Sequence, residues 1–513
     1  MSAIITDQFR ILSAKNFITS IGSTVDNYYA FVGLTNSTDY DTDWESLPPS
    51  PIDSFDNYTD IWDTIIALKK INSSDVKHVI KKIAWSSGTR YDMYRHDISR
   101  NNLSKPSNST TLYASNFYVI NSDFNVYICL HNGVDPENPS GKTSIDEPTF
   151  TDLEPRSAGT SGDGYIWKYL FSMKPNDIVK FDSLDYIPVP SNWDTNSDVA
   201  KVRDNASNVN SGQLKIVTIT NRGVGLGNPK TYTDVPIVGN GSGGKVTIIV
   251  GNNNNVESVT VSSGGSGYTF GSVDLAAGGI TGTTLPSFNV IIPPPNGHGS
   301  DIYSELGAKN ILLYSRIEND NLDPDFIVGN KVARIGIIKN PLVFGTTDTK
   351  LTKDKASNTY AIKLDDYTTS SFAANSTITQ TVSTGTTAVG RVVSFNNVTG
   401  VLKYWQDRYA VGFSTGSSSL SGNVPQYGYT LNAFISSTNQ IQGETNNVGI
   451  DTIFTGISTQ INNTTYNLGQ EFTDGLANPE VKRYTGEMIY IDNRPSITRS
   501  KNQKEDIKVV LQF

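Results

Sequence analysis

The chain contains very little cysteine and comparatively little charge. Cys129 is the single cysteine among 513 residues, which excludes an intramolecular disulfide and a Cys-x-x-Cys metal site. A reducing compartment of assembly fits this composition. Charged residues make up 18% of the chain, and the net charge is −9. A protein with this acidic balance has no general attraction for nucleic acid or for an anionic membrane surface.

Long hydrophobic runs are also missing. No apolar stretch reaches the length that a helix needs to cross a bilayer. The first ten residues carry Asp7 and Arg10 where a signal peptide would have an apolar core. We therefore expect a protein that uses neither a signal peptide nor a membrane anchor.

Turn-forming and β-forming residues are abundant. The chain has 43 glycines and 25 tyrosines against 6 tryptophans, and it is rich in Asn, Ser and Thr. This mixture favours short strands and many turns over helical bundles. The length favours two to four domains. We predict a mainly β protein, with a layered β-sandwich core, a few flanking helices and two small all-β insertion domains.

Changes in composition divide the chain into five stretches. The first insertion contains an internal repeat, because Val217–Leu226 matches Val259–Tyr268 and each copy reads as a strand followed by a glycine turn. The predicted division is 1–199 for the first part of the core, 200–290 for the first insertion, 291–344 for the second part of the core, 345–477 for the second insertion and 478–513 for the C-terminal strands.

Hydrophobic spacing predicts helices over 6–20, with Phe9 and Leu12 among the residues that set the period, and over 57–70. Alternating apolar residues predict strands through most of the rest of the chain. A stripe of aromatic side chains alternates along one strand after the tight turn Gly162–Gly164, which indicates a buried sheet face. The stripe consists of Tyr165, Trp167, Tyr169 and Phe171.

The C-terminal stretch predicts two strands. Met488–Asp492 is apolar on both alternating faces, which is typical of a strand covered on both sides, and Asn493–Pro495 is expected to end it. The final residues 507–513 alternate strictly, so the terminus is expected to lie in a sheet. The predicted core residues of this ending are Met488, Tyr490, Val509 and Phe513.

The sequence signals for ion-binding and phosphate-binding sites are weak. Asn138–Thr143 ends in the Gly-Lys-Thr of a phosphate loop, but Pro136 stands where the earlier glycine belongs. Residues 39–43 have three aspartates at calcium-loop spacing, but Trp44 and Ser50 replace the glycine and the bidentate glutamate. A solvated loop is the favoured interpretation of both. The ambiguous aspartates are Asp39, Asp41, Asp43, Asp320, Asp323 and Asp325.

The four histidines are scattered and show no metal-ligand spacing. His298 is the most suggestive, because it lies in the glycine loop Asn296–Asp301, but a loop or interface role is favoured over catalysis. No Gly-x-Ser-x-Gly elbow lies at a strand–helix junction. The sequence leaves open whether the chain carries the paired carboxylates of a glycoside hydrolase, since the distance between them depends on the folded chain. We predict no catalytic, cofactor-binding or metal-binding residues and no cofactor.

Three stretches resemble one known family. Gly162–Phe171, Ile335–Leu342 and Gly486–Pro495 are similar to the baseplate wedge protein of T-even-type contractile-tailed phages, the gene-product-eight type. The terminal Ile507–Phe513 fits the ending of that family. Weaker similarity runs through Asn16–Gly22, Asp60–Trp62 and Gly88–Tyr91.

The resemblance covers roughly 1–195, 296–342 and 480–513, and the two β-rich stretches between them read as insertions. The segment Tyr404–Arg408 resembles small β modules of cyanobacterial myophages, which favours a cyanophage-like source. The resemblance implies a homodimer that binds other baseplate wedge proteins in the virion tail, is assembled in the host cytoplasm, and has no enzymatic activity. It also implies a part in the rearrangement that triggers sheath contraction.

Two other functions stay open at this point. The β-rich insertions could make the chain a glycan-binding tail adhesin, or carboxylates unrecognised in the sequence could make it a virion-associated polysaccharide hydrolase. Our prediction is a structural subunit of the baseplate wedge.

Overall fold

The computed structural model describes residues 3–35, 44, 46–206, 212–318, 326–406, 432–500 and 503–513. Strands hold 40% of the chain and helices 11%, so the predicted mainly β class is confirmed. The chain forms two compact units. Unit 1 contains residues 1–18, 77–312 and 509–513, and unit 2 contains residues 19–76 and 313–508.

The helices are few and mostly short. They are α1 (Asp7–Ile21), α2 (Phe55–Thr64), α3 (Pro175–Phe181), α4 (Ala200–Asn205) and α5 (Ile302–Leu306), with 3-10 turns η3 (Ser73–Asp75), η4 (Leu112–Ala114) and η5 (Ser197–Val199).

The strands form several separate sheets. Up to residue 318 they are β1 (Tyr28–Gly33), β2 (Ile65–Ile71), β3 (Val76–Lys81), β4 (Tyr118–Ile120), β5 (Asn125–Asn132), β6 (Tyr165–Ser172), β7 (Tyr186–Pro188), β8 (Val217–Asn221), β9 (Lys230–Gly239), β10 (Ser242–Val250), β11 (Val256–Ser266), β12 (Gly271–Val273), β13 (Ser287–Val290) and β14 (Asn310–Glu318). The later strands are β15 (Lys331–Lys339), β16 (Leu342–Val343), β17 (Lys355–Ser357), β18 (Tyr360–Lys363), β19 (Thr377–Ser383), β20 (Thr386–Asn396), β21 (Val401–Trp405), β22 (Ile441–Gln442), β23 (Asn447–Val448), β24 (Gly456–Ile461), β25 (Thr464–Phe472), β26 (Leu476–Ala477), β27 (Val481–Lys482), β28 (Glu487–Thr498) and β29 (Lys504–Gln512).

Unit 1 has a core built around the three-stranded sheet β4-β5-β6. The aromatic stripe on β6 packs there as predicted, with Tyr165 stacked on Trp167 at 5.4 Å between ring centroids. Tyr165, Trp167 and Phe171 are buried, while Tyr169 is half-buried. The opposite face of β6 is partly covered as well, because Lys168 and Leu170 are buried there.

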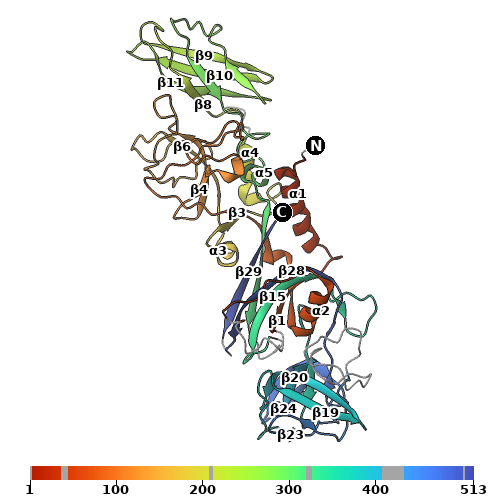
Figure 1. Cartoon of the computed structure of the whole chain (residues 1–513). Coiled ribbons are helices and arrows are strands. Elements are labelled where there is room, and N and C mark those ends of the chain that lie inside the picture. The colour runs from red at the N-terminus through yellow and green to blue at the C-terminus, as the bar shows by residue number, and fades with distance from the viewer. Residues whose placement is uncertain are drawn as a thin grey trace. The chain divides into compact units, whose positions relative to one another are not determined.

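Residues 213–292 of unit 1 have their own hydrophobic cluster, and we call them the β module. The module contains the sheet β11-β10-β9-β12 and the pair β13-β8, and the two repeat copies form β8 and part of β11. Figure 1 shows β9, β10 and β11 lying together as one sheet. Tyr268 closes the cluster, because its hydroxyl donates to Ile237 O and accepts from Gly244 N.

Unit 2 contains two larger sheets. The five-stranded sheet has the order β17-β2-β1-β15-β28, and the seven-stranded sheet has the order β23-β22-β19-β20-β21-β18-β26. In the first sheet, β15 lies between β1 and β28, where Gly336 leaves room for the ring of Phe31. In the second, a hydrophobic cluster includes Ile362, Ile378 and Leu402.

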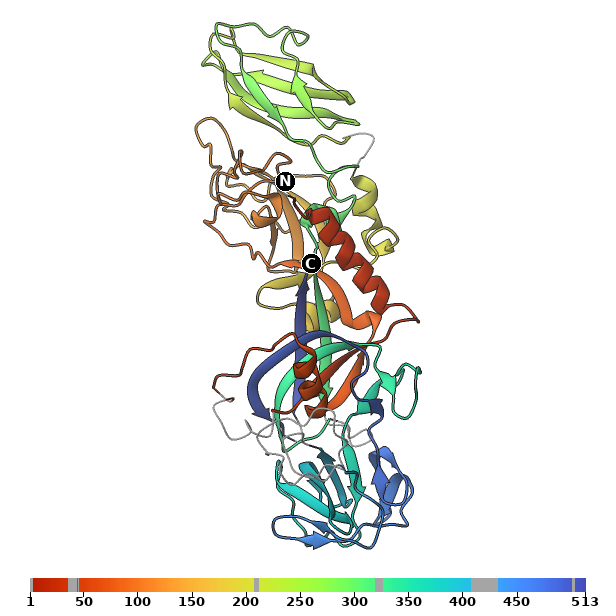
Figure 2. The ribbon, with the colours of Figure 1, turned by 45° about the vertical axis from the view of Figure 1, so that its right-hand side comes forward.

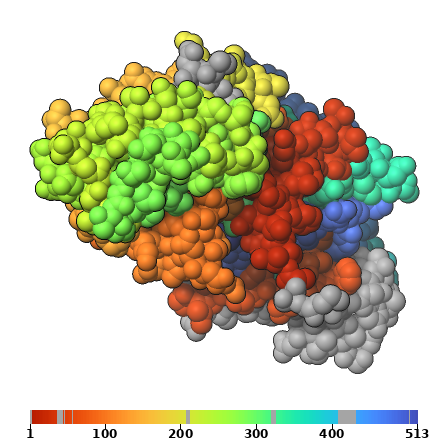
Figure 3. Space-filling model, turned by 90° about the horizontal axis from the view of Figure 1, so that it is seen from above, coloured from red at the N-terminus to blue at the C-terminus, as the bar shows by residue number. Residues whose placement is uncertain are grey.

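The predicted N-terminal helix is confirmed as α1, and two of the residues that set its predicted period are exposed. Ile11, Ala14 and Ile21 are the buried residues of α1, whereas Phe9 and Leu12 are 59% and 53% exposed. The space-filling view shows the red N-terminal segment that contains α1 lying uncovered on the face drawn (Figure 3). The helical period was therefore right, but two residues that define it point to the surface.

The predicted helix over 57–70 is wrong in its second half. Ser54 caps α2 by accepting a hydrogen bond from Asn57 N, and α2 ends at Thr64. Ile65–Ile71 then forms β2, which pairs with β1. Buried residues such as Ile61, Ile65 and Leu68 fit helical spacing, but sheet pairing decides the conformation of such a short apolar run.

The prediction that Pro495 ends the first C-terminal strand is also wrong. β28 continues to Thr498, and among the described strands it lies at the edge of its sheet, paired with β15. Proline is tolerated on an edge strand, where the missing N–H would face away from the neighbour. The expected cover on both sides of β28 is also missing, because Ile489 and Ile497 are exposed.

The last strand does end in a sheet. In the sheet β29-β14-β3-β7, Gln512 donates to Tyr186 Oη, and the ring of Phe513 lies 5.6 Å from that of Phe17. Figure 2 shows the blue β29 running beside the green β14. Of the four predicted core residues of the ending, Val509 is buried, and Met488, Tyr490 and Phe513 are half-buried.

Several predictions fall outside the described residues. They concern Asp39, Asp41, Asp43, Asp320, Asp323, Asp325 and the ending of the segment Tyr404–Arg408.

Candidate functional site

The Gly-Lys-Thr sequence lies in a loop that no helix follows. Gly141 has a φ of 72°, and Lys142 N donates to Asn132 O, so the loop folds back on the end of β5. A phosphate loop needs a strand that leads directly into a helix. The structure therefore supports the loop interpretation of this segment.

Each of the four histidines has a different hydrogen-bond partner. His298 is the most buried of the four, and its Nδ1 lies 2.6 Å from Glu305 Oε1. Glu305 Oε2 accepts from Gly299 N, so the carboxylate fixes the glycine loop from within. Trp193 Nε1 closes the same loop by donating to Gly299 O and Ser300 O. The His298–Glu305 pair therefore holds the glycine loop in place. The ring of Tyr94 packs against His298.

Lys168 is fully buried on β6, which the alternation of aromatic residues along that strand does not indicate. Its Nζ donates to Leu153 O at 2.7 Å and to Asn205 Oδ1 at 3.1 Å. Burial, with a smaller contribution from the charge of Lys215, lowers the pKa of Lys168 to about 8. The protein thus holds an ammonium group in a place where charge is costly.

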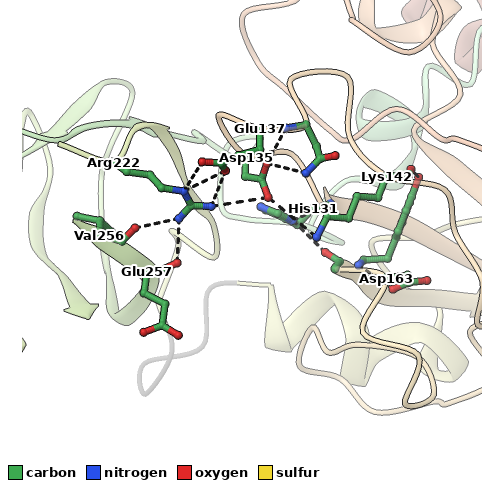
Figure 4. A network of polar contacts seen from close by, with 12 residues as sticks. His131, Asp135, Glu137, Lys142, Asp163, Arg222, Val256 and Glu257 are labelled. Carbon is green, nitrogen blue, oxygen red and sulfur yellow. Dashed lines mark hydrogen bonds and ion pairs between the residues drawn. The ribbon is translucent and has the colours of Figure 1, made fainter. Parts of the chain in front are cut away.

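A cluster of polar side chains joins the β module to the loop after β5. Arg222 follows β8 and forms a bidentate ion pair with Glu137, with Nε 2.9 Å from Oε1 and Nη2 2.8 Å from Oε2 (Figure 4). Its Nη1 donates to Val256 O and Glu257 O, which fixes the guanidinium from the module side. Hydrogen bonding to Arg222 lowers the pKa of Glu137, and the pKa of Arg222 is raised in turn.

The loop that carries Glu137 is itself braced. Asp135 lies 3.8 Å from Arg222 Nη2 and 4.0 Å from Lys142 Nζ (Figure 4). His131 Nδ1 lies 3.0 Å from both the Gly133 nitrogen and the Gly164 carbonyl oxygen. Asp163 Oδ1 accepts from Tyr165 N in the predicted tight turn. Burial lowers the pKa of His131, so a neutral ring is favoured there.

Two further links lie where the chain enters and leaves the module. Lys215 Nζ lies 3.1 Å from Glu154 Oε2, and Ile292 N donates to His96 Nδ1 at 3.2 Å. We call these two links and the Arg222–Glu137 pair the polar joint. Burial lowers the pKa of His96, which keeps its Nδ1 free to accept the bond from Ile292. The polar joint can hold the orientation of the module, which is a mechanical task.

Among the residues that the structure describes, no three His, Cys, Asp or Glu side chains are grouped to hold a metal ion. Cys129 is buried on β5, and burial raises the pKa of its thiol. None of the described helices is both long and apolar enough to cross a membrane.

The polar joint gives a first prediction. In a double-mutant cycle, Arg222→Gln and Glu137→Gln should show a coupling energy of about 1 kcal/mol, because the pair is bidentate although Glu137 is exposed. Urea denaturation of the four proteins measures the coupling. The exposed pair Arg156–Asp152 serves as the control cycle, with a smaller coupling. Equal coupling in the two cycles would contradict a specific role for Arg222.

The fold and the polar joint define a β-rich protein in which polar links hold the β module against the rest of unit 1. Residues 3–154 match the family model described as "Bacteriophage T4, Gp8". The chain is 31% identical over 212 residues to the baseplate wedge protein gp8 of Enterobacteria phage T4. That alignment covers 37% of this chain and 60% of the T4 protein, so the chain spans less than two thirds of that relative.

Proposed function

We propose that the chain is a structural subunit of the baseplate wedge of a contractile phage tail. The similarity to the T4 baseplate wedge protein supports a location in the virion tail baseplate. It also favours a role without enzymatic activity, as the sequence motifs predicted.

The observation that carries the proposal is the uncovered apolar surface at the start of the chain. It consists of Ile4, Ile5, Phe9 and Leu12, all exposed, and it lies inside the range that matches the family model. Subunits that act by assembly need such surfaces, because contiguous exposed apolar side chains are costly in a free protein. We assign this surface to another baseplate wedge protein.

The finer parts of the proposal concern assembly and movement. The chain forms a homodimer, binds neighbouring wedge proteins around the hub, and takes part in the rearrangement that triggers sheath contraction. Interfaces with two stable arrangements suit such a change. A cyanophage-like source remains part of the proposal. Sedimentation equilibrium tests the dimer directly, since it should give twice the chain mass of 55.9 kDa.

The second prediction tests the α1 surface. Phe9→Glu combined with Leu12→Glu should abolish incorporation into wedges, because two charges would have to be buried at the interface without partners. Wedges are assembled by co-expression with the other tail proteins of the same phage, and incorporation is measured on density gradients. Both side chains are exposed, so thermal unfolding should be unchanged.

A matched control places the same charges away from α1. Asn101→Glu combined with Thr110→Glu alters two exposed polar positions outside this helix and should leave incorporation intact. Absence of the unaltered chain from wedges would refute the proposed function. Normal incorporation of the Phe9/Leu12 variant would refute only the assignment of the surface.

A further inference from the structure

Unit 2 contains a cleft of about 490 Å³ beside the seven-stranded sheet. Its described walls come from β18, β21, β26 and β27 and from the loops next to them. Five aromatic residues line it, namely Phe344, Tyr360, Tyr404, Phe434 and Tyr484. A cleft of this size and lining is typical of a binding site.

The aromatic rings form a continuous stack that ends in an arginine. Phe434 packs edge-on against Tyr404 at 4.7 Å, and Tyr404 is stacked on Tyr360 at 5.4 Å. The guanidinium of Arg483 lies 4.8 Å from the Tyr360 ring centre. Its Nη2 donates to Asn358 O, which holds the group in place. The stack therefore presents a positioned cation at the cleft.

The described charged residues that line the cleft are all cations. Lys482 and Arg483 line it, and no aspartate or glutamate is among the described lining residues. Lys482 Nζ donates to Thr346 O, and neither cation forms an ion pair with a described carboxylate. The nearest acidic residue in sequence, Glu480, is already paired with Lys353. Two cations without a described ion-pair partner, in a chain of net charge −9, favour a negatively charged ligand.

Tyr484 adds an independent sign of function. Its φ is 61°, a left-handed conformation that is unfavourable for a bulky side chain. The ring is nonetheless 47% exposed, with its hydroxyl donating to buried Asp63. A strained backbone that holds an aromatic ring at the rim of a cleft is characteristic of binding sites.

We propose that this cleft binds an acidic, apolar segment of a neighbouring protein. A carboxylate of that segment pairs with Arg483 and Lys482, and an apolar side chain beside it packs between the rings of Phe344 and Tyr484. Only the identity of the partner as a tail protein rests on the proposed function. Tyrosine, phenylalanine and arginine together are the composition of the centre of a protein interface.

An acidic polysaccharide is the competing ligand, and the geometry disfavours it. Sugar rings bind on open aromatic faces, but Tyr360 is covered by Tyr404 on one side and contacts Arg483 as well. The amide of Gln406, which could bind sugar hydroxyls, already donates to Val389 O and Asn432 O. The cleft thus offers two cations beside a tyrosine ring that is already covered by another ring.

The third prediction uses the purified full chain and a phage-displayed library of random dodecapeptides. Selected peptides should carry Asp or Glu next to an apolar residue. Synthetic copies should bind Arg483→Gln/Lys482→Gln roughly tenfold or more weakly, the loss expected for charge-assisted bonds. Arg391→Gln is the matched control, because Arg391 lies in the same sheet but does not line the cleft. Arg483→Lys, which keeps the charge, should recover part of the binding.

The outcomes separate the alternatives. Peptides without acidic enrichment, or binding equal in the double variant and the unaltered chain, would overturn the proposal. Binding of polygalacturonate that the double variant loses would overturn it in favour of a sugar ligand. Thermal unfolding shows whether the double variant has a folding defect. If it has one, peptide binding is measured on Lys482→Gln alone. None of these results depends on wedge incorporation, which the α1 variants measure.

Discussion

Replacing Lys168 by methionine is expected to flatten the pH dependence of stability between pH 7 and pH 9. In the unaltered protein the Lys168 contribution to the free energy of unfolding rises by roughly 1.4 kcal/mol across this range. In Lys168→Met that contribution is absent. Urea denaturation at pH 7, 8 and 9 measures the difference between the two proteins.

The sign follows from the pKa in each state. Burial lowers the pKa of Lys168 in the folded chain to about 8, from an ordinary value of 10.5. Between these values the unfolded chain binds more protons than the folded chain, so stability rises with pH. Below pH 8 the folded protein carries the full cost of the buried ammonium. Lys168→Met should therefore be most favourable, relative to the unaltered chain, at pH 7.

Other buried groups act in the opposite direction, and the comparison removes them. Burial raises the pKa of the Cys129 thiol and of Tyr127, so their contributions to stability fall as the pH rises. Both groups are present in both proteins and cancel in the difference. Lys168→Gln is the second variant, because it keeps a hydrogen-bond donor near Leu153 O without a titratable charge. A pH slope unchanged in both variants would show that Lys168 titrates normally.

Gly336→Ala is expected to destabilise unit 2 by about 3 kcal/mol, close to the upper end for an overpacked core. A Cβ at Gly336 would lie 2.2 Å from Phe31 Cζ and 2.4 Å from Tyr490 O. β15 is paired on both sides, by β1 and β28, so the backbone cannot move away without breaking one of the two pairings. A shift of the urea midpoint measures the effect.

Gly251→Ala is the control for this substitution. Its new Cβ would meet the carboxylate end of Glu257, a flexible side chain that can turn aside. The expected change is small, within about 0.5 kcal/mol. A second variant, Phe31→Leu in the Gly336→Ala background, should recover part of the stability, because it makes room at the ring but leaves the close contact with Tyr490 O. Equal destabilisation by the two glycine substitutions would contradict the steric argument at Gly336.

The sequence predicted elements best where local pattern and tertiary pairing agree. The aromatic alternation on β6 and the strict alternation near the C-terminus both predicted strands, and both are strands. It failed where they conflict. Ile65–Ile71 fits a helical period but pairs as β2, and Pro495 is accommodated because β28 lies at an edge.

The surfaces that carry the proposals were harder to predict. Arg222 and Glu137 lie far apart in sequence, and neither belongs to a motif, so nothing local indicated the polar joint. Arg483 and Tyr360 meet only because β18 and the chain after β27 reach the same cleft. The sequence of α1 shows a helical period, but it does not show which side of the helix other segments cover.

Composition and pattern by themselves determined the mainly β class, the positions of several strands, the lack of an intramolecular disulfide and the resemblance to a baseplate wedge protein. These properties depend on residue type and on neighbours along the chain, which the sequence states directly. The tertiary structure alone decided the edge position of β28, the burial of Lys168 and the exposure of Phe9 and Leu12. Each of these depends on which distant segment covers a given face, and period-2 or period-3.6 spacing carries no information about that partner.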